Sequence, residues 1–256
     1  MVPFNSAIPI ASLRKITRTL HDSISRVATG LKVMGGNDAG SQSLANTLSA
    51  RAASFQAVES NTDSGVALLQ LAESALLELN NLATRLKEIG VADTLSTNTA
   101  ADTAALNSEA VSVSDTIDSI VSSLTFNNIN ILGTTSKTFA IGINDAGNTQ
   151  TIQSTTGIGA TNINDATNAN TSMTTTIGEI TQSLGALSGS LTSLKAYQNV
   201  ATTTKAHLIQ AASNLQDTDF AAETAKITKQ SLIRNYALAM VATANSEELE
   251  KLKLLA

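Results

Sequence analysis

Apolar side chains recur along this chain at spacings that alternate between three and four residues, and the pattern appears in several separate segments. Such spacing places the side chains on one narrow stripe of an α-helix. The first stripe consists of Leu13, Ile16, Leu20, Ile24, Val27, Leu31 and Met34. We expect its helix to begin near Pro3 and Pro9 and to end at the glycine-rich run 35–40.

The second stripe is the longest and keeps its period without a slip. Its positions are Phe55, Val58, Thr62, Gly65, Leu69, Ala72, Leu76, Leu79, Ala83 and Leu86. A strict period of about 3.5 residues over this length predicts a coiled-coil seam. We expect Gly90 and the polar run 94–98 to end this helix.

Three further stripes predict three more helices. Two of them run over 106–124 and 177–208. Gln198 and Lys205 interrupt the second of these with polar groups, which in coiled coils fix the register at some cost in stability. The last stripe is weaker and lies in the Ala-rich C-terminal stretch, at Ile227, Leu232, Tyr236, Met240, Leu249, Leu252 and Leu255.

The segment between the third and fourth helices is of a different kind. Residues 138–143 and 149–153 alternate polar and apolar, and the run Asn-Asp-Ala-Gly at 144–147 favours a turn. We therefore predict one β-hairpin over 137–153 and a polar loop over 157–172. The predicted fold class is mainly α: a long antiparallel helical bundle or coiled coil with a small β-hairpin region, in which the terminal helices pair.

The two terminal helices present one stripe each. Burying one narrow stripe against a single partner does not offset the conformational entropy lost when the whole helix becomes ordered. Such helices are stable only when several surfaces bury them, and neighbouring subunits can supply those surfaces. We expect both termini to be disordered in the monomer and to fold on assembly.

Composition removes several classes of function. Cys is absent and His occurs twice, so a disulfide framework, a thiolate metal site and a histidine-rich metal site are excluded. The net charge of -5 argues against a nucleic-acid partner. His21 and His207 have no motif beside them that supplies a nucleophile or an orienting acid. We therefore expect no enzyme and no cofactor.

Membrane contact is not expected either. No apolar run approaches the ~18 residues that a membrane-spanning helix needs, and we find no secretory signal. The N-terminal helix is basic, but its narrow apolar stripe without Trp suits a partner helix better than a lipid surface. Near the other end, Asp217, Asp219 and Glu223 favour a capped helix start over a metal site, because acids complement the helix dipole there.

Short motifs in both halves of the chain resemble, in order, those of the bacterial flagellins. Residues 23–33 read SISRVATGLKV, similar to S-x-x-R-L-S-S-G-L-R-I, and residues 61–76 read NTDSGVALLQLAESAL, similar to N-A-x-D-G-I-S-L-x-Q-T-A-E-G-A-L. Residues 37–46 resemble D-D-A-A-G-x-A-I-A, and residues 125–132 resemble T-x-F-N-G-x-x-L-L. Residues 217–223 read DTDFAAE, similar to D-x-D-[FY]-A-x-E.

This resemblance implies a filament subunit with paired terminal helices inside and a rod outside. The implied parts are an N-terminal inner coiled-coil helix (1–36), a spoke or linker (37–46), N-terminal rod helices (47–125), a hairpin and polar loop (126–172), a C-terminal rod helix (173–213) and a C-terminal inner coiled-coil helix (214–256). Their terminal stripes, except Met34, would form the subunit and coiled-coil interface.

The resemblance also implies a cellular location, an export route and partners. The chain would assemble with copies of itself into the extracellular filament of the bacterial flagellum and serve swimming motility. It would leave the cell unfolded through the flagellar type III pathway. Its partners would be an export chaperone, the filament cap and the junction proteins, with no nucleic acid and no membrane.

Some flagellins are recognised by an innate immune receptor at a site resembling Q-R-x-R-E-L-A-V-Q. Here the resemblance gives Arg85, Glu88, Ile89 and Glu109 as contact residues. Thr84, Gly90 and Ala92 depart from the motif, so we expect weak activation.

Three alternatives stay open at this point. The hook–filament junction protein shares such terminal helices but makes a short ring. A rod-borne protease would need a metal-binding signature in the variable region, where none is present. A coiled-coil effector or adhesin would not need terminal helices that are unstable alone. The Ser- and Thr-rich segment could also carry O-glycans, but we expect it to be bare.

Overall fold

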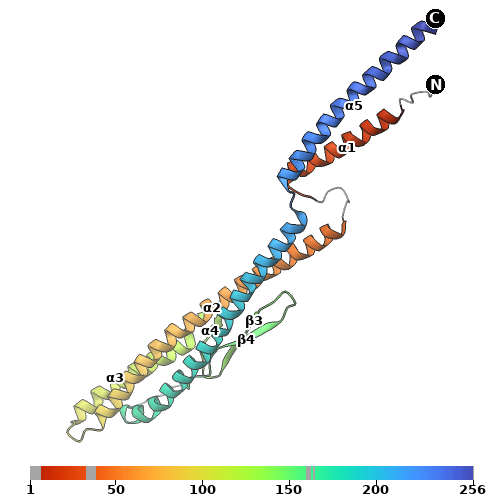
Figure 1. The fold of residues 1–256 in the computed structure, drawn as a ribbon. Helices are drawn as coiled ribbons and strands as arrows, with labels where there is room; N and C mark the ends of the chain where they lie inside the picture. The colour runs from red at the N-terminus through yellow and green to blue at the C-terminus, as the bar shows by residue number, and fades with distance from the viewer. Residues whose placement is uncertain (1–6, 33–38, 160–162, 164, 256) are drawn as a thin grey trace. The chain divides into compact units, whose positions relative to one another are not determined.

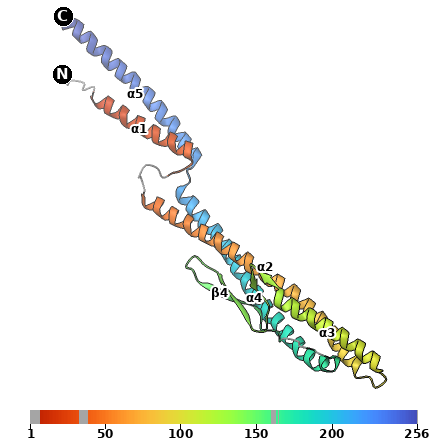
Figure 2. The ribbon, with the colours of Figure 1, turned by 180° about the vertical axis from the view of Figure 1, so that it is seen from behind.

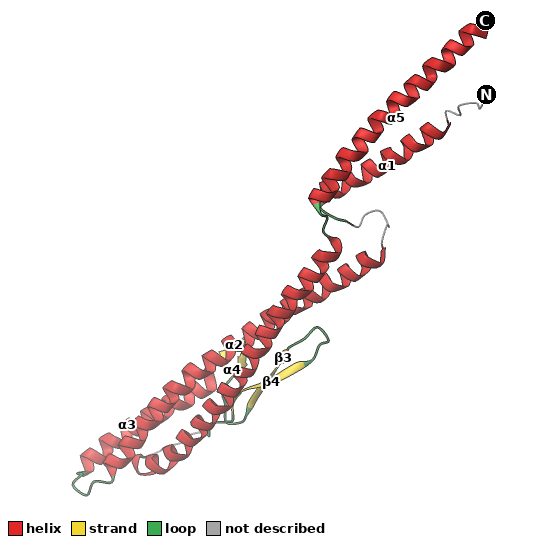
Figure 3. Ribbon diagram, viewed as in Figure 1, coloured by secondary structure: helices red, strands yellow, loops and turns green. Residues whose placement is uncertain are grey.

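The computed structural model describes residues 7–32, 39–159, 163 and 165–255 (Figure 1). Its contacts divide the chain into two compact units. We call Met1–Ala50 with His207–Ala256 the terminal unit, and Arg51–Ala206 the central unit. The described elements are α1 (Ala7–Thr29), α2 (Ala39–Asp93), α3 (Ala100–Ser123), β1 (Thr125–Phe126), β2 (Ile129–Asn130), β3 (Lys137–Gly142), β4 (Thr149–Thr155), α4 (Ala166–Gln216) and α5 (Phe220–Leu255). Helices dominate, which confirms the predicted mainly-α class (Figure 3).

In the terminal unit, α1 and α5 lie side by side and run antiparallel, as both views show (Figures 1 and 2). Pro9 lies within the first turn of α1, where a missing backbone N–H costs nothing. Helix α2 begins at Ala39, so residues 39–46 of the predicted linker are helical. Helix α1 ends at Thr29, so the predicted end of the first helix at the glycine-rich run 35–40 is wrong. Residues 35–38 of that run and Pro3 lie outside the described residues.

In the central unit, α2, α3 and α4 lie side by side, and the predicted seams form its core (Figure 2). The whole α2 stripe is buried: Phe55, Val58, Thr62, Gly65, Leu69, Ala72, Leu76, Leu79, Ala83 and Leu86. Ile117 of α3 and Ile180 and Leu194 of α4 are also fully buried. Thr62 is the polar member of the α2 stripe, and its hydroxyl donates to the helix backbone at Val58, 3.0 Å away. This confirms the prediction of a continuous coiled-coil seam.

Helix α2 ends at Asp93, directly before the polar run 94–98 as predicted, but it continues through Gly90, so the predicted breaking role of that glycine is wrong. A Cβ at Gly90 would lie 2.6 Å from the backbone N of Asn170 and 3.1 Å from the backbone O of Ala166. Glycine therefore serves there to let the start of α4 pass close to α2, and it does not break the helix.

The predicted polar loop over 157–172 is too long, since α4 begins at Ala166. The carboxylate of Asp165 accepts a hydrogen bond from the backbone N–H of Asn168 at 3.1 Å, which caps the new helix. The short polar side chains that favour a loop in the sequence here supply the cap and the first turn of a helix.

The predicted hairpin is confirmed: β3 pairs with β4 in antiparallel register, with Gly142 opposite Thr149 at the turn. The side-chain oxygen of Asn144 accepts hydrogen bonds from the backbone N–H groups of Ala146 (3.1 Å) and Asn148 (2.9 Å). This is the turn chemistry that the Asn-Asp-Ala-Gly run predicts. A salt bridge of 2.6 Å joins Arg51 of α2 to Asp145 in the turn.

A second, smaller hairpin was not predicted. Strands β1 and β2 pair across a turn at Asn127 and Asn128, whose φ angles are 51° and 62°. Asn tolerates this left-handed conformation better than most residues, and two such residues in succession suit a two-residue hairpin turn.

Serine hydroxyls of α4 hold β4 in place. The backbone N–H of Gln153 donates to Ser190 Oγ and that of Thr156 donates to Ser183 Oγ, each at 3.0 Å. The two serines are seven residues apart, so they lie on one side of the helix. They satisfy backbone groups that a two-stranded sheet otherwise leaves without a partner.

Candidate interaction surface on the terminal helices

The contact between α1 and α5 combines apolar and buried polar side chains. Leu20 is 8% exposed, Ser23 is 2% exposed and Glu223 is 5% exposed. Leu20 follows the predicted stripe, whereas the two polar residues come from positions that the apolar pattern does not mark. Half-buried α5 residues continue this side of the contact, namely Ile227, Gln230, Ala237, Val241 and Ala244.

Glu223 is the electrostatic centre of this contact. Its Oε1 accepts hydrogen bonds from Lys226 Nζ at 2.6 Å and from Arg26 Nη1 at 3.2 Å. The pKa of this carboxyl is lowered, mainly by the hydrogen bond from Lys226. The hydroxyl of Ser23 and the charge of Arg26 lower it further, whereas burial acts in the opposite direction. Glu223 Oε2 is buried without a hydrogen-bond partner among the described residues. A buried charge held from both helices ties their register together.

The end of α1 is joined to the start of α5 through backbone hydrogen bonds. Gly30 has a φ of +74°, and its N–H donates to the O of Arg26 at 2.8 Å, which closes the helix. The N–H of Thr218 donates to the O of Gly30 at 3.0 Å, and the N–H of Lys32 donates to the O of Gln216 at 2.6 Å. A positive φ at this point requires glycine, because another side chain would strain the joint.

The start of α5 is capped as predicted. Asp219 Oδ1 accepts hydrogen bonds from the backbone N–H groups of Ala221 (2.9 Å) and Ala222 (3.1 Å). This satisfies two of the free donors at a helix N-terminus and places a negative charge beside its positive dipole end.

The structure divides the predicted interface residues between two sides. On α1, Leu20 is buried, Leu13, Ile16 and Val27 are half-buried, and Ile24 and Leu31 are 45% and 38% exposed. On α5, Ile227 is half-buried, but the exposed fractions of Leu232, Tyr236 and Met240 are 58%, 75% and 62%. The side chains of Leu249, Leu252 and Leu255 lie outside what the structure describes, although their positions fall within α5.

The two apolar sides of α5 are therefore distinct. Ile227 and Val241 face α1, whereas Leu232, Tyr236 and Met240 face away from it. Sequence reasoning merged them into one weak stripe and missed Ser23, Glu223 and Val241. The signal for the inward side was present at Ile227, Ala237 and Val241, but two of these side chains are small and do not stand out in an Ala-rich segment.

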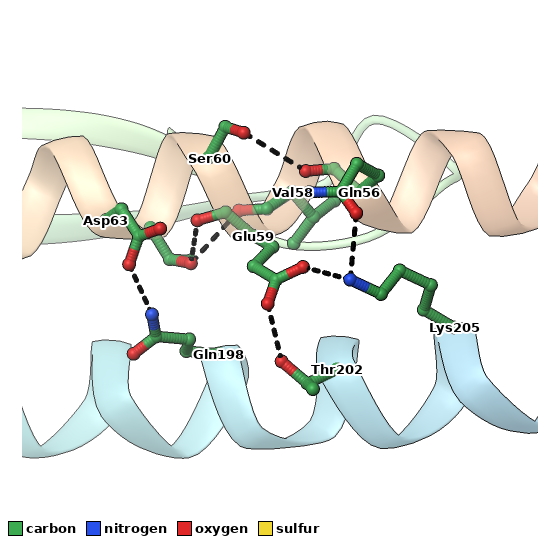
Figure 4. A network of polar contacts seen from close by, with 9 residues as sticks. Gln56, Val58, Glu59, Ser60, Asp63, Gln198, Thr202 and Lys205 are labelled. Atoms are coloured by element: carbon green, nitrogen blue, oxygen red, sulfur yellow. Dashed lines mark hydrogen bonds and ion pairs between the residues drawn. The ribbon is translucent and has the colours of Figure 1, made fainter.

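A second polar network lies in the central unit, between α2 and α4 (Figure 4). Lys205 donates to Glu59 and, at 2.8 Å, to Gln56 Oε1. The hydroxyl of Thr202 donates to Glu59 Oε1 at 3.1 Å, and Gln198 donates to Asp63. The pKa of Glu59 is lowered, mainly by the hydrogen bond from Lys205 and next by the one from Thr202. Both polar residues that interrupt the α4 stripe thus find a partner on α2.

The four residues given by the receptor resemblance have different surroundings. Arg85, Glu88 and Glu109 are exposed, and Arg85 forms salt bridges with Glu109 at 2.6 Å and with Glu88 at 3.4 Å. These bonds raise the pKa of Arg85. Ile89 is 2% exposed and lies in the core, so its side chain does not reach a partner at the surface.

The described residues also bear on metal binding and membrane insertion. His, Cys, Asp and Glu side chains do not gather there in a group of three or more that could hold a metal ion. Within the same residues, none of the helices combines the length and apolar character that crossing a membrane requires.

The chain matches the family model described as "Bacterial flagellin N-terminal helical region" over residues 5–137. This match covers more than half of the chain, so the protein belongs to the bacterial flagellin family, a family of structural proteins. The resemblance found in the sequence motifs is confirmed.

Individual relatives differ in how much of their length is shared. A flagellin of Halalkalibacterium halodurans is 28% identical over 246 residues, which is 91% of this chain and 90% of that protein. A flagellin of Escherichia coli K12 is 30% identical over 142 residues, which is 55% of this chain but 28% of that protein. The crystal structure of Bacillus cereus flagellin is 27% identical, with a TM-score of 0.47, and the match covers 55% of this chain and 88% of that one.

Proposed function

We propose that this chain is a structural subunit that self-assembles into the extracellular filament of the bacterial flagellum. One observation carries the proposal: α5 has an apolar side that no described part of the chain covers. Leu232, Tyr236 and Met240 are spaced by four residues and are each more than half exposed. A helix with apolar residues on several sides is stable in water only when several partners bury it. Copies of the same chain supply those partners in a filament.

The partly exposed end of the α1 stripe supports the same conclusion. Ile24 and Leu31 remain 45% and 38% exposed although α5 lies beside α1. The paired terminal helices thus keep apolar surface for further contacts. We infer that they form the inner coiled coil and that the central unit makes up most of the rod. The inner parts are residues 1–36 and 214–256, the spoke is 37–46, and the rod comprises 47–125, the hairpin region 126–172 and 173–213.

We further propose the partners that membership of this family implies. These are an export chaperone, which holds the chain for unfolded passage through the flagellar type III pathway, and the filament cap and junction proteins. An exposed apolar side on α5 needs cover before assembly, which a chaperone provides. Binding of purified candidates to the monomer, measured by calorimetry, tests each partner separately.

Seeded growth tests the filament proposal. Purified monomer is incubated with precipitating salt and sheared filament seeds, and the products are imaged by negative-stain electron microscopy. We expect long, uniform filaments. Growth should stop in Leu20→Asp, where a charge enters the α1–α5 contact, and in Ile24→Asp. Monomers or short caps alone, formed by the unchanged chain, would contradict a filament subunit and favour a junction protein.

A further inference from the structure

Helix α3 accompanies only part of α2. A salt bridge of 2.6 Å joins Arg85 of α2 to Glu109 of α3 and marks a level at which these antiparallel helices meet. Ser123, the last residue of α3, follows Glu109 by fourteen residues and therefore lies level with about residue 71 of α2. Residues 51–70 of α2 lie beyond the end of α3, and there the β3–β4 hairpin lies beside α2 and α4 in place of a third helix (Figures 1 and 2).

The hairpin is firmly anchored at one end. We call residues 137–155 the strap, and the end where β3 begins and β4 ends its root. Ile152, Ser154 and Thr155 are fully buried at this root. The hydroxyl of Ser154 donates to the backbone O of Ile131 at 2.6 Å, and the two serines of α4 described above hold the backbone of β4. The root therefore cannot move without breaking contacts of the core.

The middle of the strap is seated in a notch on α2. A Cβ at Gly65 would lie 3.2 Å from Cγ1 of Ile141 and 2.9 Å from Cδ1 of Leu194. The missing side chain of Gly65 thus makes room for one side chain of the strap and one of α4. Four residues earlier in α2, Asn61 Nδ2 lies 3.4 Å from the position that a Cβ of Gly142 would take. The strap therefore follows α2 towards the N-terminal end of that helix.

The tip of the strap is held more lightly. Residues 146–149 at and beside the turn are exposed. An ion pair of 2.6 Å between Arg51 Nε and Asp145 Oδ2 joins the turn to α2. The side chain of Arg51 is 51% exposed, so solvent and salt screen this pair. Exposed ion pairs shift an equilibrium by up to about fivefold. We call this ion pair the clasp.

We propose that the strap opens and closes on α2 and α4 as one piece, and that its closing determines how well ordered residues 51–65 of α2 are. Closing seats Ile141 in the Gly65 notch and brings Asp145 to Arg51, and opening withdraws both together. Two helices with a single seam and no third partner open locally at their end. The strap belongs to the single chain, so this inference stands apart from the proposed filament function.

Charge reversal with rescue tests the clasp. Amide hydrogen exchange is measured in the monomer at about 50 mM NaCl, where screening is weak. Residues 51–65 of α2 are the reporter, and residues 71–93, which lie beside α3, are the internal reference. The unchanged chain is compared with Arg51→Glu and with the exchanged pair Arg51→Glu/Asp145→Arg.

The matched control for this comparison is Lys195→Glu. Lys195 is exposed on α4 and forms no ion pair with a described residue, and its reversal makes the same change of net charge. Arg51→Glu should speed exchange over 51–65 at least about fivefold, because it sets two like charges against each other. The exchanged pair should return to within about twofold of the unchanged chain, and the control and the reference segment should stay within the same limit.

Three results of the charge reversal would overturn the strap. These are unchanged exchange over 51–65 in Arg51→Glu, failure of the exchanged pair to restore it, and an equal increase over 71–93. The last result would mean that the variant weakens the whole central unit and does not open a strap.

A covalent lock separates the strap from a local effect of the charge. The chain has no Cys, so Asn61→Cys/Gly142→Cys offers a single disulfide, which should form on oxidation because these positions face each other. In the oxidised chain Arg51→Glu should no longer speed exchange over 51–65, and reduction should restore its effect. Failure of the disulfide to form, or an undiminished effect of Arg51→Glu in the locked chain, would overturn the proposal.

Discussion

Arg26 on α1 and Glu223 on α5 are joined by a hydrogen-bonded ion pair, with 3.2 Å between Nη1 and Oε1. The side chain of Glu223 is 7% exposed and that of Arg26 is 28% exposed. The residues are 197 positions apart in the chain. A nearly buried carboxylate that accepts bonds from both helices gives the terminal pair one favoured register, because sliding either helix would strand a buried charge.

Glu223 makes the stability of the terminal pair depend on pH. Its pKa in the folded chain lies below the ordinary value of 4.5, mainly because of the bond from Lys226. A carboxyl whose pKa is lowered by folding stabilises the fold above its unfolded pKa, and that contribution is lost as pH falls through the folded pKa. Glu223→Gln should therefore destabilise filaments at pH 7, by about 1–3 kcal/mol per subunit. The difference in stability between the variant and the unchanged chain should become smaller below pH 4.5.

Heat-induced disassembly at pH 7 and at about pH 4, where carboxyls titrate, measures this difference. Asp22→Asn is the matched control, because Asp22 is exposed on the same helix pair. Its effect should be small at both pH values. A Glu223→Gln deficit that stays constant with pH would show that the carboxylate charge does not contribute.

Gly90 should tolerate no side chain, although it lies inside a helix. Replacing a helical glycine by alanine ordinarily stabilises by about 0.5–1 kcal/mol. At Gly90 the new Cβ would lie 2.6 Å from the backbone N of Asn170, so α2 and α4 would have to separate. We expect Gly90→Ala to destabilise the central unit by about 1–3 kcal/mol.

Urea unfolding followed by circular dichroism measures this effect. Gly185→Ala on α4 is the control, since nothing lies within 4 Å of a Cβ there. That variant should be neutral or slightly stabilised. Equal stabilisation of both variants would show that the helices do not approach as closely as the structure places them.

Lys205 should contribute to the α2–α4 contact more than a surface lysine does. It donates to Glu59 and Gln56, and the pKa of Glu59 is lowered mainly by the bond from Lys205. Lys205→Met should lower the midpoint of urea unfolding and raise the pKa of Glu59, which NMR titration can follow. Lys195→Met on the same helix should change stability by less than about 0.5 kcal/mol. Equally small effects in Lys205→Met and Lys195→Met would mean that the network adds nothing to the stability of the α2–α4 contact.

The sequence predicted the regular parts of this fold well, for a physical reason. The α2 stripe from Phe55 to Leu86 has large apolar side chains at a strict period, and only one helical face can bury them together. The hairpin turn at Asn144 was likewise predictable, because its side chain forms local hydrogen bonds with the turn.

The parts that escaped prediction depend on contacts distant in the chain. Gly90 resembles a helix breaker until the backbone of Asn170 is placed beside it. Glu223 resembles an ordinary acid of a first helical turn until Ser23 and Arg26 surround it. On α5, the two apolar sides become separable only once α1 marks which of them faces inward, because apolar residues occupy every position of the run 236–242 in the middle of the helix.

The most direct test of the account is whether the exposed side of α5 drives assembly. Tyr236→Asp places a charge at a position that is 75% exposed in the chain, so folding of the chain should not change. Ser231→Asp is the control, because Ser231 is exposed on a different side of the same helix. In seeded elongation, Tyr236→Asp should slow growth at least about thirtyfold, equivalent to about 2 kcal/mol, while Ser231→Asp grows within about threefold of the unchanged chain. Filaments that grow equally fast from both variants would contradict the central claim.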